Sequence, residues 1–269
     1  VATYDDNDHT FTNTYNADGE TEITGTKYIE GRDFQSGDSF TFTVTADDRN
    51  PDAPLPEHST VTINPTSGTS ATLDFGKIKY TLADLGDQGN RSKTFYYNVA
   101  ETGKGTGLTF AGSKTFSVTV TETGTEKLSV SNDLDKNPLS FKNTYNANGK
   151  IQLDVIKKLE NREFQKGDNW TFTLAGKDTD YTDPMPEGKG NVITADATSG
   201  SSKTYQFGTI NYKLADLDGN KSRDFHYTIT EGGKVTGVTN DEDKVLNVTV
   251  AVTNDGGDKL SVVATYDDN

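Results

Sequence analysis

Two lysines stand where the pattern of a β-strand predicts a buried side chain. The alternate positions around Lys27 and Lys157 are apolar or small, namely Ile23, Gly25 and Ile29 in one case and Leu153, Val155 and Leu159 in the other. Strand side chains alternate between two faces, so each lysine shares its face with residues expected to form a core. Because an unpaired ammonium is costly to bury, each lysine must be paired, neutral or consumed in a reaction.

A glutamate and an asparagine occupy comparable places on two other predicted strands. Glu101 and Glu231 each end an alternating apolar face, formed by Phe95, Tyr97 and Val99 in one case and by Phe225, Tyr227 and Ile229 in the other. Asn143 lies between Phe141 and Tyr145, and Asn13 lies between Phe11 and Tyr15. If three such strands meet in one core, a lysine, a carboxyl group and an asparagine are enclosed together among aromatic rings.

These three groups are the ingredients of an intramolecular isopeptide bond. Burial favours a neutral, nucleophilic lysine and a protonated glutamic acid that can polarise the asparagine amide. The amine would attack the side-chain carbonyl, the glutamate would move the protons and ammonia would leave. Folding can drive the reaction, because well-oriented groups reach effective molarities of about 10⁵ M or more. Two alternatives are a lysine that blocks pairing at a sheet edge and a buried, non-covalent Lys–Glu salt bridge.

The composition indicates that β-strands must position these groups. The 269 residues suffice for two domains, and short runs rich in Thr, Val, Tyr and Phe are separated by Gly, Asp and Asn turns. The chain has no cysteine, so any covalent stabilisation must be something other than a disulfide. A net charge of -15 argues against binding to nucleic acid or to anionic membrane surfaces.

The chain repeats itself with a shift of 130 to 132 residues. Phe11–Ala17 recurs as Phe141–Ala147, Phe116–Val120 resembles Leu246–Val250, and residues 1–7 are identical to residues 263–269. The 269-residue sequence therefore resembles part of an array of two-domain units. We expect residues 1–17 to be the terminal strand of a preceding repeat, residues 18–147 to form domain 1, and residues 148–269 to form domain 2 without its last strand.

Three segments carry a resemblance to a known family: Lys27-Tyr-Ile-Glu-Gly-Arg32, Tyr97-Asn-Val-Ala-Glu101 and Phe141-Lys-Asn143-Thr-Tyr145. Together they resemble the isopeptide domains of Gram-positive backbone pilins and surface adhesins, of the streptococcal T-antigen (FctA-like) type related to Cna B-type domains. The resemblance implies an all-β fold with two tandem Ig-like β-sandwiches in a rod. It also implies a Lys27–Asn143 bond with Glu101 as proton shuttle. Lys157 with Glu231 would need an asparagine from the next repeat, or Asn13 of an adjacent molecule.

The function implied is structural: a stalk or shaft repeat on the cell-wall-attached, extracellular surface of a Gram-positive bacterium. Its partners would be adjacent repeats or head-to-tail copies of itself, with no nucleic acid and no membrane insertion. The alternative is an adhesin module whose loops at 47–58 and 178–189 bind a host glycan or protein. We expect no enzyme activity beyond the single-turnover cross-link and no cofactor. The acidic stretches at 5–8, 216–220 and 240–243 complete no recognised calcium loop, so we expect solvated turns and no metal site.

Overall fold

The computed structural model describes residues 2–5, 10–86, 91–180, 182–241 and 244–267. This part of the chain is all-β apart from the short 3-10 helices η1 (Leu82–Leu85) and η2 (Leu214–Leu217). It divides into two compact units, Val1–Tyr145 and Asn146–Asn269. Within these residues no helix is long and apolar enough to cross a membrane. Of the acidic stretches considered above, residues 6–8 and 242–243 lie outside the described residues.

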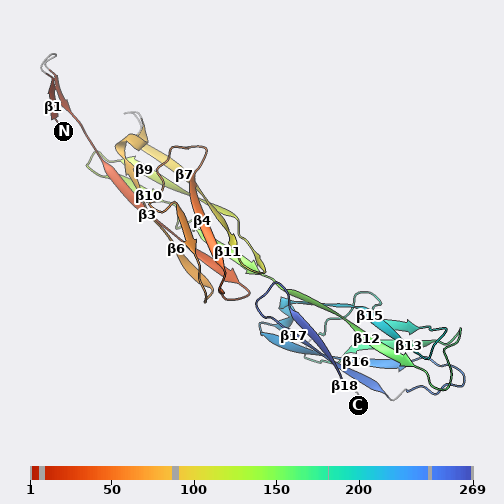
Figure 1. Cartoon of the computed structure of the whole chain (residues 1–269). Coiled ribbons are helices and arrows are strands. Elements are labelled where there is room, and N and C mark those ends of the chain that lie inside the picture. The colour runs from red at the N-terminus through yellow and green to blue at the C-terminus, as the bar shows by residue number, and fades with distance from the viewer. Residues whose placement is uncertain (1, 6–9, 87–90, 181, 242–243, 268–269) are drawn as a thin grey trace. The chain divides into compact units, whose positions relative to one another are not determined.

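Unit 1 is built around two β-sheets (Figure 1). One sheet has the order β10 (Leu128–Asn132), β9 (Ser113–Glu122), β7 (Ser92–Lys104), β4 (Ser39–Ala46) and β5 (Thr60–Ile63). The other has the order β6 (Ser70–Thr81), β3 (Asp18–Glu30), β11 (Ser140–Tyr145) and β8 (Leu108–Thr109). The domain therefore closes by placing β11, its last strand, directly beside β3, its first.

The core of unit 1 lies between the inner faces of these sheets. In β4 the alternation of threonine with larger apolar residues buries Phe40, Phe42 and Val44. Tyr80 and Tyr97 are fully buried, and their hydroxyls share a hydrogen bond of 2.7 Å across the core. The buried rings pack as the sequence pattern of alternating strands predicts.

The strands β3 and β11 run parallel to each other. In the register of β3 and β11, Lys27 lies opposite Phe141 and Ile29 lies opposite Asn143. Side chains two residues apart share a face, so this register puts Lys27 and Asn143 on the same face of neighbouring strands. A parallel pair needs a long connection, and here that connection is the rest of the domain.

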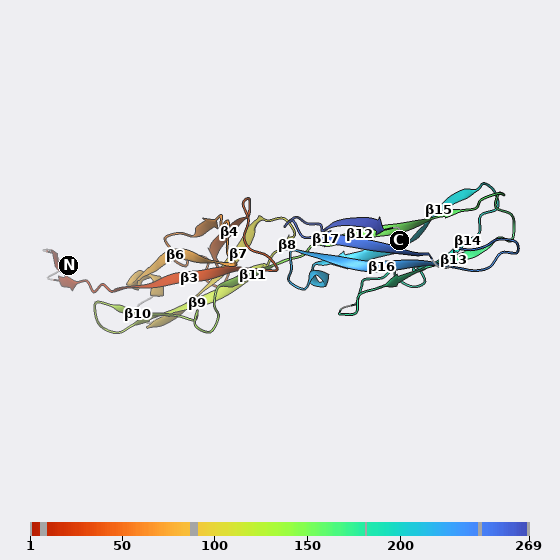
Figure 2. The same ribbon diagram turned by 90° about the horizontal axis from the view of Figure 1, so that it is seen from below.

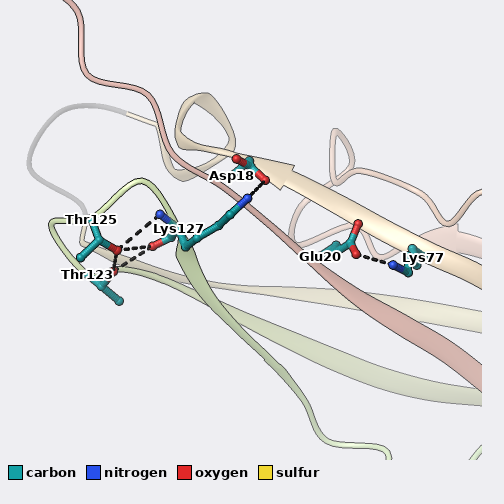
Figure 3. Close-up of polar contacts among 6 residues, drawn as sticks. All are labelled: Asp18, Glu20, Lys77, Thr123, Thr125 and Lys127. Atoms are coloured by element: carbon teal, nitrogen blue, oxygen red, sulfur yellow. Dashed lines mark hydrogen bonds and ion pairs between the residues drawn. The ribbon is translucent and has the colours of Figure 1, made fainter.

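A small polar network lies at the start of β3 (Figure 3). The Lys127 ammonium donates to the Asp18 carboxylate at 2.8 Å, and the hydroxyls of Thr123 and Thr125 donate to the Lys127 carbonyl. The Tyr15 hydroxyl donates to the Thr125 carbonyl oxygen. Exposed pairs of this kind contribute little stability, but they tie the start of β3 to the turn before β10.

Residues ahead of β3 form a hairpin. β1 (Ala2–Asp5) pairs antiparallel with β2 (Thr10–Asn13), so that Asn13 lies opposite Ala2. All four residues of β2 are exposed. Our expectation that residues 1–17 complete a preceding domain remains a prediction, and within this chain the two short strands pair with each other.

Unit 2 also contains a five-stranded sheet, but its second sheet is smaller than that of unit 1 (Figure 2). Its larger sheet has the order β14 (Val192–Ala195), β13 (Trp170–Gly176), β16 (Ser222–Gly232), β17 (Val245–Thr253) and β18 (Ser261–Asp267). Its second sheet contains β12 (Asn148–Lys158) paired with β15 (Ser202–Lys213). Among the described residues, no strand lies beside β12 where β11 lies beside β3.

The strand register corrects one detail of the internal repeat. Tyr97 lies opposite Phe116 in unit 1, whereas its counterpart Tyr227 lies opposite Val248. Phe116 therefore corresponds to Val248, and the sequence alignment of Phe116 with Leu246 was wrong by two residues. A slip of two keeps every side chain on its own face, so alternation alone could not detect it. The two-residue insertion precedes β17.

Candidate functional site

Three polar side chains from three strands meet inside unit 1. Lys27 comes from β3, Asn143 from β11 and Glu101 from β7 of the opposite sheet. The Lys27 Nζ lies 2.9 Å from Glu101 Oε1, and Asn143 Nδ2 donates to the same oxygen at 3.0 Å. Lys27 and Asn143 are both 0% exposed. The sequence predicted that these three residues would share a core, and the structure brings them into hydrogen-bonding contact.

Aromatic rings enclose this group. The Lys27 Nζ lies 4.8 Å from the centroid of the Phe40 ring, and the rings of Phe42 and Phe141 lie 4.9 Å apart. Phe42 lies opposite Glu101 in the register of β4 and β7, and Phe141 lies opposite Lys27. The rings exclude water from the site, and this low-polarity setting strengthens the remaining electrostatic contacts.

Burial changes the protonation chemistry of Lys27. Its pKa is lowered from the usual value, chiefly because burial disfavours the ammonium, while the hydrogen bond and charge of Glu101 oppose the shift. A lowered pKa increases the fraction of neutral amine, which is the form that can attack a carbonyl. The environment therefore favours nucleophilic behaviour at Lys27.

The site contains one contribution that side-chain patterns did not predict. The backbone N–H of Ala111 donates to Asn143 Oδ1 at 2.9 Å. Ala111 lies between β8 and β9, in a segment with no regular strand pattern. A backbone donor of this kind leaves no mark in the sequence, because any residue except proline supplies it.

Arg32 belongs to one of the sequence motifs, but the motif did not predict that it pairs with Asp38. Arg32 Nη1 and Nη2 donate to the two carboxylate oxygens of Asp38 at 2.7 and 2.9 Å, which helps to hold the pKa of Asp38 below its usual value. The guanidinium lies 5.2 Å from the centroid of the Tyr145 ring. Arg162 and Asp168 repeat the same paired contact in unit 2. That recurrence at a shift of 130 was the signal that could have revealed the pair.

The corresponding site of unit 2 is open. Lys157 Nζ lies 2.5 Å from Glu231 Oε1 and 4.6 Å from the centroid of the Trp170 ring, but Lys157 remains 9% exposed. Both residues line a groove of about 510 Å³ whose walls include Val155, Phe172, Ile229, Leu246 and Tyr266. The structure pairs the predicted lysine and glutamate and places no asparagine of the described part of unit 2 beside them.

Asn13, the remaining predicted residue, belongs to the other unit. It ends the exposed strand β2, next but one to Phe11, whose side chain is 79% exposed. The order Phe11, Asn13, Tyr15 repeats the order Phe141, Asn143, Tyr145 of β11, so this exposed strand has the composition of a core strand.

Known proteins provide a comparison for this arrangement. A family model described as "FctA: Spy0128-like isopeptide containing domain" matches residues 23–146 and again 153–269. A search of curated proteins gives no match.

Solved structures also align with the chain. A variant of the major pilin of Streptococcus pyogenes is 16% identical, with 91% of this chain and 98% of that chain covered and a TM-score of 0.32. The unmodified major pilin is 14% identical, with 95% and 99% covered and a TM-score of 0.28. A streptococcal ancillary pilin is 15% identical, with 93% and 63% covered and a TM-score of 0.22. At these TM-scores the superpositions carry no argument, and the assignment rests on the family model.

Proposed function

Because the chain belongs to the FctA family of Spy0128-like isopeptide domains, we propose that it is a structural shaft segment of a Gram-positive surface fibre, stabilised by a Lys27–Asn143 isopeptide bond. The observation that carries the proposal is the buried contact of Lys27 Nζ and Asn143 Nδ2 with one oxygen of Glu101, at 2.9 and 3.0 Å. A non-covalent salt bridge would explain Lys27 and Glu101, but it gives no role to a buried amide on the same oxygen.

The reaction requires an amine, an amide and a proton carrier, and the site supplies all three. The neutral Lys27 amine attacks Asn143 Cγ, and Glu101 accepts a proton from the attacking nitrogen. Glu101 then donates a proton to Asn143 Nδ2, the C–N bond breaks and ammonia leaves. The product is a secondary amide between Lys27 Nζ and Asn143 Cγ. The reaction occurs once per chain, so the domain is its own substrate and not an enzyme acting on others.

The position of the bond suits a fibre under tension. Lys27 and Asn143 lie on neighbouring parallel strands and enclose 116 residues of chain (143 − 27). Force applied at the two ends of the domain would pass from β3 to β11 through this bond, and the residues between would carry little of it. By the loop-closure estimate for cross-links, a loop of about 100 residues contributes roughly 4 to 5 kcal/mol of stability.

We extend the proposal to unit 2, where Lys157 and Glu231 are paired and the reaction would need an asparagine amide from another strand. A strand with the sequence of β2 would fill the vacant edge of β12, with Phe11 opposite Lys157 and Asn13 opposite Leu159 if it adopts the register of β11 on β3. The recurrence of the β11 sequence in β2 supports this pairing, as do Val155, Phe172 and Ile229, which are apolar residues in the groove wall. The strand can come from a following repeat or from a second copy of the chain, by addition to a sheet edge.

Intact mass after folding tests the bond in domain 1. We expect the monomeric chain to have lost one ammonia, and Lys27→Ala, Glu101→Ala and Asn143→Ala each to retain it. Lys157→Ala is the matched control, because it removes the equivalent lysine of unit 2 and should leave the mass loss unchanged. A folded native chain of full mass would refute the proposal.

Denaturing electrophoresis tests completion between molecules. Concentrated chain should form a ladder of covalent multimers that Asn13→Ala and Lys157→Ala each abolish. If only monomer is seen at every concentration, covalent completion in trans is excluded.

A further inference from the structure

The amide oxygen of Asn143 has a hydrogen-bond donor of its own. Ala111 N–H donates to Asn143 Oδ1 at 2.9 Å, whereas Asn143 Nδ2 donates to Glu101 Oε1 at 3.0 Å. A backbone N–H can only donate, so the atom facing Ala111 must be the oxygen of the amide. The two contacts together therefore fix which way the amide points: its oxygen faces Ala111 and its nitrogen faces Glu101.

The Ala111 N–H is held in place before any reaction. The short strand β8 precedes it and pairs with β11, with Thr109 opposite Thr144 and Leu108 opposite Tyr145. On its other side, the Gly112 carbonyl accepts a hydrogen bond from the Glu101 N–H at 3.4 Å. The segment is thus tied both to the strand that carries the asparagine and to the strand that carries the glutamate. The side chain of Ala111 is exposed and does not contribute.

We propose that the backbone N–H of Ala111 is the oxyanion donor for the cross-linking reaction, an inference that rests on the proposed Lys27–Asn143 bond. When Lys27 Nζ bonds to Asn143 Cγ, the C=O π electrons move onto Oδ1, which becomes negatively charged while the carbon is tetrahedral. The Ala111 N–H already points at that oxygen. When the C–Nδ2 bond breaks, the electrons return to form the new carbonyl, and the nitrogen leaves as ammonia with the proton that Glu101 supplies.

In this arrangement Glu101 transfers the protons and the Ala111 N–H stabilises the oxyanion. Glu101 Oε1 touches both nitrogens, so it can take the proton from Lys27 Nζ and deliver it to Asn143 Nδ2 without moving to the oxygen. The Ala111 N–H stabilises the negative charge that develops on Asn143 Oδ1. Donors aimed at such an oxygen contribute strongly when water is excluded, and removal of one typically slows a reaction about 10²- to 10³-fold.

Replacement of the Ala111 amide by an ester tests the proposal. The full chain is made by cell-free translation with lactic acid in place of Ala111 (Ala111→lactic acid), which removes the N–H and keeps the methyl group. Samples are quenched over time, the folded fraction is selected by protease resistance, and ammonia loss is read by intact mass. Ala111→Ser, which keeps the N–H at an exposed position, is the matched control. Ala111→Pro is a second variant without the N–H.

We expect folded Ala111→lactic acid chains to lose ammonia about 10²- to 10³-fold more slowly than the native chain, and Ala111→Ser chains to match the native rate. An ester variant that reacts at the native rate overturns the role of Ala111 while leaving the Lys27–Asn143 bond intact. A native chain that never loses ammonia overturns both. Selection of folded chains ensures that a folding defect is not read as slow chemistry.

Discussion

The two units contain the same lysine and glutamate in different states of enclosure. In unit 1 Lys27 is completely buried and its glutamate also binds an amide, whereas in unit 2 Lys157 is partly exposed and borders an open groove. Much of the surrounding framework is shared: the pair Tyr212–Tyr227 repeats Tyr80–Tyr97, with a hydroxyl distance of 2.8 Å. The units differ at the edge of the smaller sheet: β11 lies beside β3 in unit 1, whereas no described strand occupies the corresponding place beside β12 in unit 2.

This comparison shows that one strand supplies two things at once. β11 brings the amide of Asn143, and it also places Phe141 over the site, which completes the burial of Lys27. In the proposed reaction, nucleophile activation and the arrival of the electrophile are coupled, because the strand that brings the amide also completes the burial of the lysine. In unit 2 the lysine and the glutamate are paired and line a groove.

The largest expected effect is on stability: loss of Lys27 should destabilise unit 1 more than loss of Lys157 destabilises unit 2. Lys27→Ala removes the cross-link, which is worth roughly 4 to 5 kcal/mol of stability. Lys157→Ala removes a non-covalent pair that closes no loop of chain, so it should cost unit 2 less, although it leaves Glu231 without its cation. Thermal unfolding followed by calorimetry should show the unit 1 transition falling more than the unit 2 transition. Equal shifts would mean that no bond forms in unit 1.

A second prediction concerns a chain in which unit 2 is given a strand equivalent to β11 of unit 1. Extension of the chain beyond Asn269 with the sequence of residues 8–17 should give unit 2 its last strand and its amide. We expect a second ammonia to be lost and the stability of unit 2 to rise by roughly 4 to 5 kcal/mol from the cross-link. The same extension with alanine at the asparagine position is the control. It should restore the strand without the mass change, and a second loss of ammonia in that control would contradict the assignment.

A third prediction concerns Asp183, which occupies the buried position of Ala53 in unit 1. Burial raises the pKa of Asp183 to about 6, and neighbouring Asp178 adds to the shift. Because the folded pKa exceeds the unfolded value near 4, the folded state binds more protons between these values. The contribution of Asp183 to stability is therefore present below pH 4 and is lost as the pH rises through about 6.

Asp183→Ala should remove that pH dependence from unit 2. At pH 7 it should also stabilise the unit by about 1 to 3 kcal/mol, because it eliminates a buried oxygen, Oδ1, that has no hydrogen-bond partner among the described residues. Asp180→Ala, at an exposed neighbouring position, is the control. Unfolding in urea between pH 4 and 7 measures both effects, and an unchanged slope in Asp183→Ala would be the contrary result.

The smallest expected effect involves Tyr266, whose hydroxyl accepts the Asp154 N–H and donates to Asp154 Oδ1, both at 2.9 Å. These contacts stabilise β12 close to its vacant edge. Tyr266→Phe should destabilise unit 2 by about 0.5 to 1.5 kcal/mol in chemical denaturation. Tyr15→Phe, which removes an exposed hydroxyl contact of unit 1, should leave the stability of unit 2 unchanged. If both variants leave unit 2 unchanged, the Tyr266 contacts contribute nothing.

Much of this arrangement could be predicted from the sequence because alternation fixes faces. Period two placed Lys27, Glu101 and Asn143 on inward faces, and the internal repeat predicts which strand domain 2 lacks. Alternation does not fix register, which is why Phe116 was aligned with Leu246 when its counterpart is Val248. The role of the Ala111 N–H was also beyond prediction, since backbone donors are common to nearly every residue.

The most direct test of the central claim is peptide mapping of the folded monomer by tandem mass spectrometry. The account predicts one branched peptide in which the Lys27 side chain is joined to the side chain of Asn143, together with Lys157 in an unmodified linear peptide. Recovery of Lys27 and Asn143 in separate linear peptides from a folded chain would contradict it.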